Sequence, residues 1–216
     1  MKRVFGTAEA VFDILYLLAA TIIGILILTS AQGNPARVLA GFMALVLVGG
    51  DAFHLLPRIR VIMTGEEKKL RHALGLGKQI TSITMAVFYV LLWHIGLIIY
   101  APDNARCWSC AVYILAAARV ALCLFPQNKW RERYSPGSWG VWRNVPFVAQ
   151  GAVVAGLFFI FRNAARGFGL AWLAIILSFL FYAPVVLWVQ RNPKIGMLML
   201  PKTCSYLWLL IMCLSL

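Results

Sequence analysis

Long runs of apolar residues, separated by short polar segments, make up most of this chain. Of its 216 residues, 62% are hydrophobic and only 12% are charged, whereas soluble domains carry roughly 25% charged residues. A helix needs about 20 predominantly apolar residues to cross the hydrocarbon core of a bilayer, and the apolar runs approach or reach that length. The sequence therefore predicts an all-α, polytopic integral membrane protein.

Seven segments are long and apolar enough to be transmembrane helices, and the connections between them are short. Breakers such as Asn34-Pro35 and Asn192-Pro193 lie in these connections. No soluble domain fits between the segments, so residues 1–216 are expected to form a single transmembrane helical domain. We expect helices near residues 8–30, 38–60, 79–101, 108–125, 142–162, 168–190 and 196–216.

The positive charge of the chain predicts its orientation. The formal net charge is +13, with 20 Lys and Arg residues, but these residues lie between apolar segments, where they act as topology signals rather than as a nucleic-acid surface. With a cytoplasmic N-terminus, only Arg37, Arg106, Arg162 and Arg166 fall outside, and the C-terminus also lies outside. This orientation predicts a multi-pass protein of the cell membrane. The basic residues on the cytoplasmic side are then Lys2, Arg3, Arg58, Arg60, Lys68, Lys69, Arg71, Lys78, Lys129, Arg131, Arg133, Arg143, Arg191, Lys194 and Lys202.

Several expected helices carry polar residues, which are costly in a membrane and usually face the interior of a bundle. Glu9 and Asp13 share one face of the first helix, and Asp51, His54 and Arg58 share one face of the second. Nearly all such residues fall in the cytoplasmic half. The sequence therefore predicts one polar cavity open toward the cytoplasm, lined by Asp13, Asp51, His54, Arg119 and Tyr182 or Tyr206.

Two simpler interpretations remain open for these polar residues. Four of them can lie among the lipid headgroups, where charge is ordinary: Glu9, Lys78, Gln190 and Lys202. Asp51 can also form an ion pair with Arg58 or Arg119 that only holds the helices in register.

Asp51 is the first candidate for catalysis, because a carboxyl group in a water-poor cavity can act as a general acid or base. His54, one helical turn away, can share the proton, and Asp13 or Glu9 can supply a second carboxylate. Two carboxyl groups in different environments suit acid-catalysed hydrolysis of an acetal-like or vinyl-ether bond. The same groups also suit a proton relay.

No metal or other cofactor is expected at this site. Asp51 and His94 would lie about 10 Å apart in depth at 1.5 Å per residue, which is too far for a shared metal ion with His54. The role of His94 stays open. At the outer face, Cys107 and Cys110 form a CxxC motif that indicates either a redox or disulfide pair or two unpaired helical cysteines.

Residues 45–100 resemble the lysoplasmalogenase-like (YhhN) family of polytopic membrane proteins. Gly50-Asp51 matches the Gly-Asp pair of that family in an apolar helix, and His94 with Tyr100 on the next helix matches its second element. The resemblance implies hydrolysis of the vinyl-ether bond of a lysophospholipid, with Asp51 as the acid. Because no Asp or Glu follows Glu132, a second carboxylate would come from Asp13 or Glu9.

Three functions are therefore compatible with the sequence. The first is a lipid-active hydrolase that binds membrane lipids with anionic headgroups. The second is a sensor, receptor or assembly subunit with structural charges, and the third is a small proton-coupled transporter that uses Asp51 and Arg119. For the first, the expected substrate-binding residues are Arg58, Lys78, Arg119, Lys202, Tyr182 and Tyr206.

Overall fold

A computed structural model of the protein describes residues 2–132, 136–165 and 167–216, with side chains from residue 6 onward. In this part of the chain, seven helices are long and apolar enough to cross a membrane. The prediction of an all-α membrane protein with seven transmembrane helices is therefore confirmed. The helices are α1 (Lys2–Thr29), α2 (Pro35–Thr64), α3 (Glu67–Tyr100), α4 (Arg106–Leu124), α5 (Gly137–Ile160), α6 (Ala171–Trp188) and α7 (Met199–Cys213), with short 3₁₀ helices η1 (Pro126–Asn128) and η2 (Pro193–Leu198).

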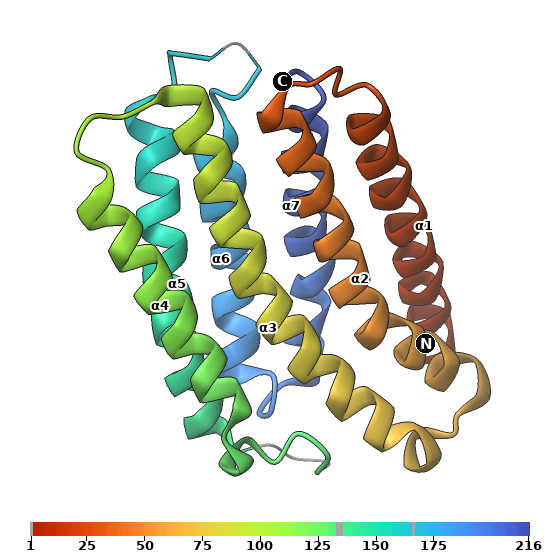
Figure 1. Ribbon diagram of the computed structural model, residues 1–216. Helices are drawn as coiled ribbons and strands as arrows, with labels where there is room; N and C mark the ends of the chain where they lie inside the picture. The colour runs from red at the N-terminus through yellow and green to blue at the C-terminus, as the bar shows by residue number, and fades with distance from the viewer. Residues whose placement is uncertain (1, 133–135, 166) are drawn as a thin grey trace.

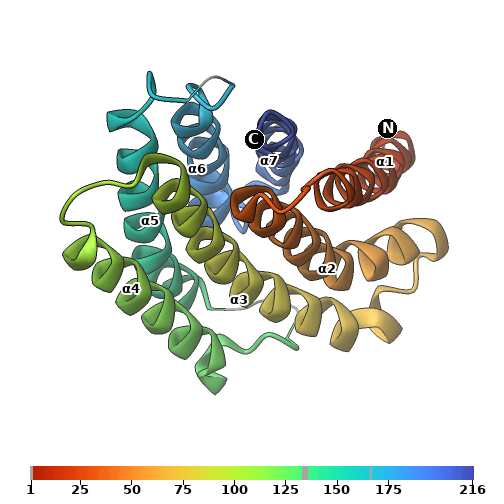
Figure 2. The same ribbon diagram turned by 45° about the horizontal axis from the view of Figure 1, so that its top comes forward.

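Successive helices pack against each other in chain order, and α7 closes the bundle against α1 and α2 (Figures 1 and 2). The helices alternate in direction, so the bundle has two distinct ends (Figure 1). We call the end where α1 begins the basic end, because most Lys and Arg residues of the connections lie there, and the end with the C-terminus the opposite end. Arg133 and Arg166, which the orientation argument includes, lie outside the described residues.

Most helix boundaries differ from the expected ones by a few residues, and the start of α3 differs most. α3 begins at Glu67 rather than near residue 79, so it continues past the bundle at the basic end (Figure 1). Hydropathy detects only the part of a helix that lies in lipid, and the preceding turn at Gly65, with φ of 75°, ends α2 just before α3 begins. α7 begins at Met199 rather than near residue 196, because η2 precedes it.

Helices α2 and α3 approach each other closely where Gly77 of α3 meets Phe53 and His54 of α2. A Cβ atom at Gly77 would lie 2.2 Å from the carbonyl oxygen of Phe53, so only glycine fits there. Pro57, inside α2, has no N–H to donate to that carbonyl. The close contact therefore packs α3 against a carbonyl that the helix itself cannot satisfy.

Candidate functional site

Three carboxylates, Glu9 and Asp13 on α1 and Asp51 on α2, lie near the basic end of two helices that pack against each other. The charges of Glu9 and Asp51 both act on Asp13, whose side chain is only 6% exposed. Arg58 binds Glu9 in an ion pair with two contacts: its Nε lies 2.8 Å from Glu9 Oε1, and its Nη2 lies 3.3 Å from Glu9 Oε2. Within the described part of the chain, Asp13 Oδ2 is buried without any hydrogen-bond partner. A buried carboxylate oxygen without a partner is costly, and such groups gather at functional sites.

Asp51 is held from two sides. The hydroxyl of Tyr16, on α1, donates a hydrogen bond of 2.8 Å to Asp51 Oδ2. The backbone before Asp51 is tied to α3, because Thr81 Oγ1 donates to the Gly50 carbonyl at 2.8 Å. Asp51 is thus partly buried and bonded to a polar side chain of another helix, as the cost of an unpaired charge in lipid predicts. Its partner is Tyr16, however, and not Arg58 or Arg119.

Lys202 lies inside the bundle and not at the surface among the lipid headgroups. Its side chain is 8% exposed, and its ammonium nitrogen lies 4.6 Å from the ring centre of Tyr182 and 5.3 Å from that of Tyr206. The η2 segment, which immediately precedes α7, packs against both α6 and α7. The aromatic faces stabilise the ammonium, and its charge acts on Asp51.

Arg119 forms a second polar centre, between α3, α4 and α5. It is only 2% exposed and donates to three oxygens: Nε to the Ser82 carbonyl at 3.0 Å, and Nη1 to the Arg143 carbonyl at 3.0 Å and to Asn144 Oδ1 at 2.8 Å. Its guanidinium carbon lies 3.7 Å from the ring centre of Phe147. The charge is thus stabilised by neutral dipoles and an aromatic face, and no ion pair of Arg119 with a carboxylate occurs among the described residues.

Tyr182 connects the two centres. Its hydroxyl donates to Asn144 Oδ1 at 3.1 Å, while its ring lies below the Lys202 ammonium. Two further hydroxyl groups were not singled out from the sequence: Tyr89 and Ser178 lie 3.3 Å apart, buried near Tyr206. A hydroxyl inside an apolar run hardly changes hydropathy, so the sequence holds no clear signal for this pair.

The hydrogen bond to Asp51 does not involve three other expected site residues, His54, Arg58 and Lys78. His54 is half-buried, and its Nδ1 has no hydrogen-bond partner in the described residues. No hydrogen bond joins His54 to Asp51 in this part of the chain. Arg58 and Lys78, two of the expected substrate-binding residues, are exposed at the basic end. Of the expected catalytic residues, Asp13 and Asp51 therefore lie on neighbouring helices within range of each other's charge, and His54 is one helical turn along α2 from Asp51.

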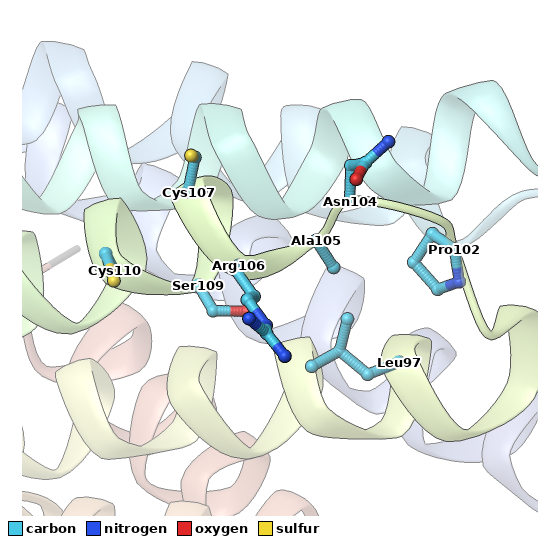
Figure 3. A pocket seen from close by; sticks show the side chains of 8 residues that line it. All are labelled: Leu97, Pro102, Asn104, Ala105, Arg106, Cys107, Ser109 and Cys110. Atoms are coloured by element: carbon cyan, nitrogen blue, oxygen red, sulfur yellow. The ribbon is translucent and has the colours of Figure 1, made fainter.

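The polar residues at the opposite end are fewer and form small pairs. The Tyr113 hydroxyl and His94 Nε2 lie 2.8 Å apart at the surface between α3 and α4. Next to them, an open hollow is lined by residues of the α3–α4 connection and the start of α4 (Figure 3). This hollow does not include any residue of the predicted cavity. Across the described residues, no three His, Cys, Asp or Glu side chains are placed to hold a metal ion.

Together, these features define a polytopic membrane protein whose seven helices enclose charged and hydroxyl side chains near the basic end. The arrangement can hold a proton on a carboxyl group, supply a second carboxylate and keep a cation nearby. No family model, curated protein or solved structure matches the chain.

Proposed function

We propose that the protein is a membrane-embedded hydrolase that cleaves the vinyl-ether bond of a lysophospholipid. The observation that carries this proposal is the buried Asp13 oxygen without a partner, placed beside the Asp51–Tyr16 hydrogen bond. A buried acid that lacks a partner has room in its interactions for substrate or water. The resemblance of residues 45–100 to the lysoplasmalogenase-like family suggests the same reaction from Gly50-Asp51.

In the proposed mechanism, Asp51 donates a proton to the vinyl-ether carbon, and the Tyr16 hydrogen bond holds the carboxyl group in place. Water then adds to the resulting oxocarbenium carbon, with Asp13 as the general base. The hemiacetal then collapses: its hydroxyl proton passes to Asp51, Asp13 gives its proton to the leaving oxygen, and an aldehyde and a glycerophospholipid alcohol are released. Both carboxyl groups regain their starting states, one water molecule is consumed and no cofactor is required. Lys202 stabilises the negative charge that Asp51 acquires when it gives up its proton.

Substrate binding follows from the charges at the basic end. Arg58 and Lys78 are exposed there and can bind the phosphate of a headgroup, while the alkenyl chain lies along the apolar helices. Arg119 donates to three neutral oxygens and Lys202 has an aromatic environment, so we assign both to the protein interior rather than to the phosphate.

Turnover of an alkenyl lysophospholipid by purified protein tests the proposal, with released aldehyde as the readout. Asp51→Asn should abolish aldehyde release, while Lys129→Gln, at an exposed site in the α4–α5 connection, should leave it unchanged. Both variants should elute from size-exclusion chromatography in detergent as the wild type does. Full activity of Asp51→Asn would remove Asp51 from the mechanism. If the wild type hydrolyses no member of a panel of ether and ester lysophospholipids, a sensor or assembly subunit becomes the better proposal.

One observation favours a sensor or assembly subunit: the hydrogen bonds of Arg119 link three helices, as a structural residue would. The transporter alternative is weaker. Asp51 and Arg119 each bond to other residues, and few polar side chains continue toward the opposite end.

We further propose that the basic end faces the cytoplasm of a cell membrane. In cells expressing a cysteine-free background, Gly137→Cys at the basic end should be shielded from an impermeant thiol reagent, while Asp103→Cys at the opposite end should react. The reverse labelling pattern would overturn the orientation.

A further inference from the structure

Two cysteines lie together at the opposite end of the bundle, far from the carboxylates. Cys107 and Cys110 occupy the first turns of α4, which begins at Arg106, and both are free and exposed. Figure 3 shows both on this helix, with their side chains pointing in different directions and Leu97 on the neighbouring α3. The other three cysteines differ: Cys123 and Cys213 are buried, and Cys204 is exposed on α7. Only this pair in the described chain combines CxxC spacing with exposure.

Both cysteines line an open hollow of about 890 Å³, together with Pro102, Asn104 and Arg106. That volume is in the range of sites that bind small molecules, roughly 300–1,000 Å³. Leu97 provides an apolar wall, and Arg106 provides a cation for a ligand with carboxylates. The hollow therefore offers a small molecule a place beside two thiols.

We propose that Cys107 and Cys110 form a thiol–disulfide exchange site for a small-molecule disulfide. One thiolate attacks the disulfide, forms a mixed disulfide and releases the first thiol of the small molecule. The second cysteine then attacks the mixed disulfide, closes the Cys107–Cys110 bond and releases the second thiol. Two cysteine thiols are oxidised, one disulfide is reduced to two thiols, and the two cysteine protons pass to the leaving thiolates.

Helix geometry explains why this bond can form and reopen. Residues three apart in an α-helix have Cα atoms about 5 Å apart, which a disulfide accepts, but Cβ atoms about 5–6 Å apart, which is roughly 1–2 Å too far. The first turn of a helix can tighten, because its N–H groups are not held by intrahelical bonds. Exposed disulfides that need such an adjustment are the readily reduced ones.

The experiment uses the full-length protein in detergent, equilibrated with glutathione and glutathione disulfide at graded ratios. Free thiols are then blocked, and the peptides are analysed by mass spectrometry. The peptide with Cys107 and Cys110 should lose two hydrogens as the ratio becomes oxidising and regain them when it is reversed. Cys107→Ser and Cys110→Ser should instead each retain a mixed disulfide with glutathione, and Cys204→Ser should behave as the wild type. If the wild-type pair is alkylated at both thiols at every ratio, or retains two mixed disulfides, the proposal fails.

A second measurement separates a binding hollow from two merely exposed thiols. Arg106→Gln should slow oxidation by glutathione disulfide several-fold and leave oxidation by the neutral hydroxyethyl disulfide unchanged, because only the first carries carboxylates. Equal rates of the variant and the wild type with both reagents would contradict a site in the hollow. These results do not depend on lipid hydrolysis, so the two proposals stand or fall separately.

Discussion

The two buried polar centres near the basic end differ in how completely their charges are satisfied. Between α3, α4 and α5, Arg119 donates to three oxygens and lies against the face of Phe147. Between α1 and α2, Asp13 is also buried but leaves one oxygen without a partner. A charge with all of its partners holds helices together, whereas a charge that lacks one can bind something else. This contrast distinguishes Arg119, which holds helices together, from Asp13, which is part of a candidate site.

The largest effect on stability should come from removing Arg119, the charge whose hydrogen bonds link α3, α4 and α5. Arg119→Met keeps the apolar volume but removes the hydrogen bonds to two carbonyls and one of the two to Asn144 Oδ1, so we expect a loss of about 3 kcal/mol of unfolding free energy. Unfolding in mixed micelles with increasing denaturing detergent measures it. Arg106→Met, at an exposed site on the same helix, is the control and should change little. Equal stability of the two variants would show that Arg119 does not hold these helices together.

A smaller loss of stability should follow from forcing apart α2, which carries Asp51 and His54, and α3. In Gly77→Ala, the new Cβ would lie 2.2 Å from the Phe53 carbonyl and 2.7 Å from His54 Cα, both backbone atoms. We expect a cost of roughly 1–3 kcal/mol. Gly49→Ala is the matched control, because a Cβ there meets nothing within 4 Å, and it should stabilise the helix by up to about 1 kcal/mol. If both substitutions stabilise the protein, α2 and α3 are not in close contact.

The connection between the two centres can be weakened without removing either. Tyr182→Phe deletes the hydroxyl that bonds to Asn144 but keeps the ring below Lys202. We expect a loss of about 1 kcal/mol, and a larger loss for Tyr182→Leu, which also removes the aromatic face. Thermal unfolding of both variants in detergent distinguishes the two contributions. Identical melting of Tyr182→Leu and wild type would mean that the centres are not coupled through this residue.

The smallest effect on stability should come from replacing Asp13, the buried acid with one oxygen that has no hydrogen-bond partner. Asp13→Asn removes a buried charge whose Oδ2 makes no hydrogen bond, so we expect unfolding free energy within about 1 kcal/mol of the wild type. Aldehyde release should nevertheless fall sharply, because the general base is lost. A large loss of stability would place Asp13 with Arg119 among the structural residues instead.

The sequence by itself determined the class of fold and much of the polar composition of the bundle interior. Seven apolar segments can satisfy their backbone groups in lipid only as helices, so hydropathy was sufficient for the helix number, though not for the start of α3, whose first turns are polar. The cost of charge in lipid also identified Asp13, Asp51 and Arg119 as inward-facing.

Only the tertiary structure decided which of these residues are partners. Depth along each helix follows from sequence position, but the rotation of each helix and the neighbour it faces depend on close packing, such as that of Gly77 on α2. The sequence therefore left Asp51 with Arg58 or Arg119 as candidate partners, whereas packing paired it with Tyr16 and paired Arg58 with Glu9. Lys202 was expected among the headgroups and lies inside the bundle, because α7 turns its side chain toward the rings of Tyr182 and Tyr206.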